Sequence, residues 1–201
     1  MARRVFFSFH YPDVQSFRVN VIRNANVVKN RDIDETGFYD ASIWETAKTR
    51  GPSALQVLID AALVNTSVSA VLTGEHTYSR DWVRYEIAKS FSRGNGLLAI
   101  DIHNIKGKDG TYGTKGPNPF DFLASQVDAQ AGRVKVLEWD AIAKKWVSFG
   151  RLPSFPLANL KGRNLASGQL SAFAKRYDWV NDNGYASLES WVEMAAIQAG
   201  R

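Results

Sequence analysis

Three short apolar runs alternate with segments of helical spacing, and this alternation constrains the fold of the 201-residue chain more than any other feature. The runs are Arg4–Phe9, Val68–Leu72 and Leu97–Ile102. The first is apolar on both of its faces, which is typical of a strand buried in a parallel sheet. Strands and helices that alternate with short connections predict an α/β fold, a parallel sheet with helices on both faces.

Capping residues, glycines and apolar spacing predict the helices. We expect a helix that Asp13 caps, one that Gly51 and Pro52 open, one that Ser79 caps and Gly94 ends, and two near the C-terminus at Ser167–Tyr177 and Ser187–Gln198. The apolar side of the first helix is predicted to consist of Phe17, Val21, Ala25 and Val28. The last two helices predict a folded, helical elaboration after the core.

The segments between these elements carry fewer signals. Phe38–Trp44 fits either a short edge strand or an ordered loop, and the residues leave both readings open. Lys106–Pro119 is rich in glycine, lysine and proline, which predicts an exposed loop. Val134–Trp139 has the pattern of a strand, and Trp139–Phe149 has that of a β-hairpin.

Length and hydrophobic content predict one domain. A chain with 45% hydrophobic residues can bury one sizeable core, so we expect a single domain over residues 1–201, with a core of about 1–140 and a C-terminal elaboration of about 141–201. The sequence has no run of about 18 apolar residues that could cross a membrane. It also lacks the pattern of a secretory signal, so we expect a cytoplasmic protein with no membrane partner.

Residue types exclude several kinds of site. The chain has no cysteine, which excludes disulfides, thiolate catalysis and cysteine-ligated metals. Its three histidines, His10, His76 and His103, are scattered, and we expect no metal site. The net charge of +5 comes from dispersed basic residues, which predicts a solvated surface and no specific nucleic-acid partner.

The first strand points to a site at its carboxyl end. In a doubly wound sheet the ligand crevice lies at the carboxyl ends of the strands. Because side chains alternate along a strand, Ser8 and His10 point to the same side of the sheet, toward that crevice. The alternative is that Ser8 is a small core residue and that His10 caps a loop.

Glu86 is a carboxylate on the apolar side of a predicted helix. Viewed down the helix axis, helical spacing places the Glu86 side chain at an angle between those of Trp82 and Val83, among the residues that face the core. A buried charge costs free energy unless it is paired, hydrogen-bonded or facing a polar cavity. Glu86 is therefore either part of an ion pair, for example with Lys89 or Arg93, or a catalytic carboxylate at the crevice.

Sequence motifs spread over nearly the whole chain resemble one family. They are Arg4–Tyr11, Phe38–Glu45, Trp82–Ile87, Lys115–Asp121, Tyr177–Val180 and Ser190–Val192. Together and in this order they resemble the TIR-like proteins of the bacterial Thoeris antiphage system, the ThsB family.

The resemblance implies a flavodoxin-like TIR fold that uses NAD⁺ as its substrate and no cofactor. It implies that, on phage infection, the enzyme makes a cyclic ADP-ribose isomer, a diffusible nucleotide that switches on a partner effector, ThsA. A phage-derived trigger and a homo-oligomer are also consistent with it. The family's catalytic glutamate corresponds to Glu86, and its pocket residues correspond to Ser8, His10 and Asp40, which we expect to bind substrate.

Other functions compete with this one. The main alternative is a non-catalytic TIR-like scaffold, in which the pocket only binds a nucleotide and Trp82–Ile87 supports self-association. A nucleoside deoxyribosyltransferase would also use a glutamate on ribose. A flavodoxin is unlike this chain, because His10–Asp13 is not a phosphate-binding loop rich in Ser, Thr and Gly. A phosphoaccepting receiver is unlike it too, because Val68–Leu72 is followed by Thr and Gly and not by an aspartate.

Overall fold

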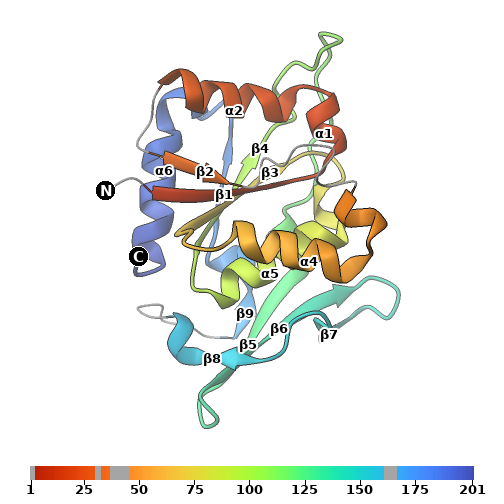
Figure 1. Ribbon diagram of the computed structural model, residues 1–201, viewed down its shortest axis with the longest axis vertical. Coiled ribbons are helices and arrows are strands. Elements are labelled where there is room, and N and C mark those ends of the chain that lie inside the picture. The colour runs from red at the N-terminus through yellow and green to blue at the C-terminus, as the bar shows by residue number, and fades with distance from the viewer. Residues whose placement is uncertain (1–2, 30–32, 37–45, 161–166) are drawn as a thin grey trace.

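Five parallel strands form the central sheet of the computed structural model, which describes residues 3–29, 33–36, 46–160 and 167–201 (Figure 1). The strand order is β10-β4-β3-β1-β2, with every neighbouring pair parallel. The strands are β1 (Arg3–Phe9), β2 (Ile33–Thr36), β3 (Val68–Thr73), β4 (Gly96–Asp101) and β10 (Lys175–Asp178). This is the order of a flavodoxin-like sheet, so the predicted α/β fold is confirmed.

Helices cover both faces of this sheet, as predicted. On one face, α2 (Arg18–Lys29) and α6 (Gly184–Gln198) pack against side chains such as Val5 and Phe7 of β1. On the other face, α4 (Pro52–Ala62) and α5 (Asp81–Ser92) pack against Phe6 of β1 and Val71 of β3. Alternate residues of β1 therefore serve two separate cores, which is why the run is apolar on both sides.

A second, antiparallel sheet covers the outer side of α5 (Figure 1). Its strands are β5 (Leu123–Asp128), β6 (Arg133–Asp140), β7 (Lys145–Ser148) and β9 (Gly168–Gln169), and β8 (Phe155–Pro156) pairs with β6. Val134 and Val136 of β6 share one core with Phe91 of α5, and the Phe91 and Phe155 rings lie edge to face at 6.1 Å. Helix α5 is thus enclosed between two sheets.

The predicted helix over Ser167–Tyr177 is wrong. This segment holds β9, a 3-10 turn (η4, Leu170–Ala172) and β10. Its apolar residues have helical spacing, but Leu170 and Ala174 join the core around α5, whereas Tyr177 stacks on Trp191 of α6 at 4.3 Å. Because the apolar residues belong to two different cores, one helix could not bury them.

The predicted first helix is broken into two. Phe17 has φ 68°, and this left-handed residue separates α1 (Pro12–Gln15) from α2. The break rotates the apolar side of α2, so Val19 and Ile22 are buried, whereas Phe17 is 47% exposed. Asp13 lies inside α1, and Tyr11 is in the capping position.

The start of α5 also differs from the prediction, whereas its end agrees with it. Ser79 belongs to a 3-10 turn (η1, Thr77–Ser79), and Arg80 precedes the helix. Gly94 follows α5 with φ 74°, a left-handed conformation that suits glycine and ends a helix.

The remaining expectations have different outcomes. The loop over Lys106–Pro119 is confirmed up to Pro119, which begins the 3-10 turn η2 (Pro119–Phe122), and β6 and β7 form the predicted hairpin. Phe38–Trp44 lies outside the described residues, and the domain boundaries stay a prediction. Within the described ranges, no helix has both the length and the apolar character needed to cross a bilayer.

Candidate active site

A pocket of about 340 Å³ opens where β1 ends and α5 begins. The pocket is lined by residues 9–12 at the end of β1 and just beyond it, by residues 80–83 and Glu86 around the start of α5, and by Lys48 and Leu55. Within the sheet, β2 lies beside one edge of β1, and β3, the next strand along the chain, lies beside the other edge. The strand order therefore reverses at β1. Ligands of doubly wound sheets bind at this kind of reversal, at the carboxyl ends of the strands.

Glu86 is the buried acid of this pocket. Its residue is 5% exposed, and Ser8 of β1 donates a hydrogen bond from Oγ to Glu86 Oε2 at 2.5 Å. No basic side chain among the described residues forms an ion pair with Glu86, and Lys89 is paired with Asp60 at 2.8 Å. The ion-pair explanation of this buried acid therefore finds no support in the described residues.

Burial determines the protonation of Glu86. Burial raises the pKa of Glu86 to about 8, and the hydrogen bond from Ser8 opposes that rise only in part. At neutral pH the carboxyl group of the free protein is therefore mostly protonated. A positively charged ligand group in the pocket would lower this pKa and ionise Glu86.

Burial of Glu86 predicts a pH-dependent effect of Glu86→Gln on stability. The pKa of Glu86 is about 8 in the folded protein and about 4.5 ordinarily, so the contribution of this acid to stability is full below pH 4.5 and is lost as pH rises to about 8. Gln does not titrate, so its contribution to stability does not change over this pH range. We compare the melting temperature of the variant minus that of wild type at the two pH values. We expect this difference to be larger at pH 8 than at pH 5 by at least about 2–4 °C, which corresponds to roughly 1 kcal/mol in the free energy of unfolding.

Thermal unfolding of both proteins at the two pH values measures this difference. A difference in melting temperature that is the same at pH 5 and pH 8 would show that Glu86 is not a desolvated acid.

A chain of hydroxyl groups fixes the backbone beneath Glu86. Ser69 of β3 donates to Ser90 Oγ at 2.7 Å, and Ser90 donates to the backbone carbonyl of Glu86 at 2.6 Å. All three residues are buried. The helix turn that carries Glu86 is thus tied to β3, while the Glu86 side chain is tied to β1.

The other predicted site residues have different positions. His10 lines the same pocket, and burial, followed by the charges of Arg80 and His76, lowers its pKa to about 4, so it is neutral at pH 7. Ser8 is 1% exposed and contacts Glu86 beneath the pocket lining. Asp40 lies outside the described residues. The structure therefore brings Ser8, His10 and Glu86 together, and their functional roles stay predictions.

The predicted site residues Ser8, His10, Asp40 and Glu86 account for only part of the pocket. The pocket is also lined by Lys48, Arg80 and Trp82. Arg151, which follows β7 in the chain, lies over the Trp82 ring, with its Cζ atom 5.1 Å from the ring centre. The rule that places the crevice at the carboxyl ends of the strands does point to Arg80, in the segment between β3 and α5. The position of Arg151 depends on how the second sheet packs, which no local pattern reveals.

A cluster of acids and one histidine lies at the ends of β4 and β10. The ligand atoms of Asp101, His103 and Asp178 lie within 4.8 Å of one another, a grouping that could hold a metal ion. Positive charge is already supplied there by the chain, because Arg176 Nη2 lies 2.7 Å and Lys115 Nζ 3.5 Å from Asp101. The donor set is thus poorly suited to a further cation, and the expected absence of a metal stays a prediction.

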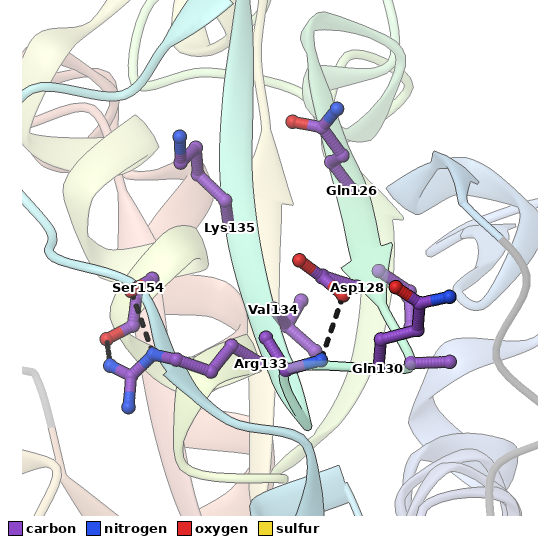
Figure 2. Close-up of a pocket in the computed structure, with 10 residues that line it drawn as sticks. Gln126, Asp128, Gln130, Arg133, Val134, Lys135 and Ser154 are labelled. Atoms are coloured by element: carbon purple, nitrogen blue, oxygen red, sulfur yellow. Dashed lines mark hydrogen bonds between the residues drawn. The ribbon is translucent and has the colours of Figure 1, made fainter.

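A larger hollow lies at the end of the β5–β6 hairpin and has different chemistry. The hollow has a volume of about 580 Å³, and Figure 2 shows that the guanidinium of Arg133, one of its lining residues, is hydrogen-bonded to Ser154. Its acidic and basic lining side chains, Asp128, Arg133 and Lys135, are exposed. Because functional sites concentrate perturbed, buried ionisable groups, the smaller pocket with Glu86 is the better candidate.

Comparison with known proteins is consistent with this choice. Residues 6–107 match a family described as Thoeris protein ThsB, TIR-like domain. A protein of Bacillus cereus (strain MSX-D12) named "Putative cyclic ADP-D-ribose synthase ThsB1" is 44% identical over 194 residues, which cover 96% of this chain and 100% of that protein. The family match includes Ser8 and Glu86 and ends after β4, whereas the likeness to the Bacillus protein extends over both sheets.

Proposed function

The chain belongs to the Thoeris ThsB family of TIR-like proteins, and on this premise we propose that it is a signal-producing enzyme that consumes NAD⁺ and makes a cyclic ADP-ribose isomer. The observation that carries the proposal is the buried carboxyl group of Glu86, which faces a pocket at the reversal of strand order without a cationic partner among the described residues. The name of the Bacillus relative, a cyclic ADP-D-ribose synthase, supports the same activity. From the family resemblance we also propose that the product acts on an effector protein, ThsA, after phage infection.

The chemistry needs one carboxylate. When the bond between nicotinamide and ribose breaks, its electron pair leaves with nicotinamide, which departs as a neutral molecule and needs no general acid. Positive charge develops on the ribose, and an ionised Glu86 would stabilise it and hold the ribose hydroxyl groups. The positive nicotinamide ring of the bound substrate favours the ionised form of Glu86, which is mostly protonated in the free protein.

The product depends on which nucleophile reaches the ribose. Attack by a hydroxyl group of the same ADP-ribose closes a ring, whereas attack by water gives linear ADP-ribose, and either nucleophile loses a proton as its bond to the ribose forms. A pocket that excludes water favours the ring.

The proposed function is tested by mass spectrometry of small molecules from phage-infected cells that express wild type or Glu86→Gln. Infected cells supply any phage trigger that the purified protein would lack. A cyclic ADP-ribose species found only with wild type supports the proposal. Phage protection without any such species would favour the non-catalytic scaffold, and release of bases from added free nucleosides would favour a deoxyribosyltransferase.

Ser8 is expected to set the pH range of the reaction through Glu86. Its hydrogen bond favours the ionised carboxylate, so Ser8→Ala should raise the pKa of Glu86 further. We expect kcat/KM for NAD⁺ to rise with pH through about 8 in wild type, and this acidic limb to move up by about one pH unit in Ser8→Ala. Ser125→Ala, which removes another buried hydroxyl in the second sheet, should leave the limb in place. Identical profiles for wild type and Ser8→Ala would contradict this role.

A further inference from the structure

Arg80 is a cation of the pocket that the proposed chemistry does not use. It precedes α5, lines the pocket, and is exposed. Within the described part of the chain, its side chain forms no hydrogen bond or ion pair. Lys48 also lines the pocket but already takes part in another interaction. Arg80 is thus the available positive group at the mouth of the pocket.

The acids around Arg80 leave its charge available to a ligand. Asp81, the next residue, is paired with Arg151 at 2.8 Å. Asp13 is partly buried beside Gly74; burial raises its pKa to about 6, and the charges of Arg18, His76 and Arg80 oppose that rise. His10 is neutral at pH 7, so it has no charge that would attract or repel an anionic ligand. The pocket therefore has an acid at its buried end and a guanidinium at its mouth.

The spacing of these two groups fits a dinucleotide. Glu86 lies six residues after Arg80, which is about 9 Å along a helix axis. If Glu86 holds the ribose that carries nicotinamide, as the proposed function requires, the next group along the substrate is the diphosphate. A guanidinium can bind phosphate oxygens with two parallel hydrogen bonds, which suits it to that group.

We propose that Arg80 binds the diphosphate of the substrate and thereby selects a dinucleotide over a nucleoside. This inference rests on the proposed function. It explains why the mouth of the pocket holds an arginine that has no ion-pair partner among the described residues, while the neighbouring Asp81 is neutralised by Arg151. It also separates the enzyme from a nucleoside deoxyribosyltransferase, whose free nucleoside substrate has no phosphate to bind.

The experiment measures binding in full-length Glu86→Gln protein, in which turnover cannot obscure affinity. Isothermal titration calorimetry compares NAD⁺ with nicotinamide riboside, which lacks phosphate. We expect Arg80→Gln to weaken NAD⁺ binding about 10- to 100-fold and to leave riboside binding unchanged. Arg80→Lys should recover part of the loss, because lysine keeps the charge but not the paired hydrogen bonds. Lys135→Gln, which removes an exposed charge from the second sheet, is the control and should bind both ligands as its parent does.

Three results would overturn the inference. Equal NAD⁺ affinity with and without Arg80 contradicts this inference and leaves the proposed function standing. An equal loss of affinity for NAD⁺ and for the riboside in Arg80→Gln has the same meaning. An absence of NAD⁺ binding in the Glu86→Gln parent contradicts the proposed function and this inference with it. Unchanged thermal unfolding of Arg80→Gln, expected for an exposed side chain, excludes misfolding as the cause of weaker binding.

Discussion

Glu86→Gln is expected to lower NAD⁺ turnover by about a thousandfold or more while the protein stays folded. Gln keeps the size of the side chain and can still accept the hydrogen bond from Ser8, but it cannot become negative when positive charge develops on the ribose. The loss should appear in kcat more than in KM, because the carboxylate acts mainly in the transition state. Nicotinamide release, followed by chromatography, measures both constants.

The control for this variant is Glu189→Gln, the same chemical change at an exposed position of α6. It should leave kcat and KM as they are in wild type. If Glu86→Gln keeps more than about a tenth of the wild-type rate, stabilisation of the ribose by Glu86 is excluded.

The second large effect is expected at Gly96, the first residue of β4. A Cβ atom at this position would lie 2.3 Å from the backbone carbonyl oxygen of Ala195 in α6. Neither backbone is free to move, because β4 lies between β10 and β3 in the sheet and α6 buries Trp191 and Val192 against it. We expect Gly96→Ala to cost about 3 kcal/mol or more, which lowers the melting temperature by roughly 6–12 °C.

Thermal unfolding of Gly96→Ala measures this loss. Gly150→Ala is the matched control, because a Cβ atom at Gly150 has no neighbour within 4 Å, and its melting temperature should stay close to that of wild type. A Gly96→Ala protein as stable as that control would mean that α6 lies farther from β4 than the structure places it.

Much of the central sheet could be predicted from local patterns. The runs that became β1, β3 and β4 are apolar on both sides because each strand lies between two layers of helices. Glu86 stands out in the sequence because one carboxylate interrupts an apolar helix side. Its protonation could not be predicted, because the partner Ser8 is 78 residues away in sequence, and no local pattern distinguishes a hydroxyl partner from a cation.

The second sheet was the least predictable part. Strands β8 and β9 are two residues long, too short for a periodic pattern. The apolar residues of Ser167–Tyr177 have helical spacing although they enter two cores, so the spacing alone predicted the wrong element. The sequence of α5 looks like that of a helix with one buried side, whereas Tyr85, Ala88 and Ser92 are buried as well.

The enclosure of α5 limits how this protein could be divided or recombined. The antiparallel sheet is encoded between β4 and β10, so the chain leaves the parallel sheet, builds its neighbour and then returns to finish the first. A fragment that stops after β4 would lack β10 and α6 and would bare the outer side of the helix that carries Glu86. The smallest transferable unit that keeps this pocket is therefore both sheets together, and a gene exchange with a breakpoint inside residues 123–169 would separate the two halves of one core.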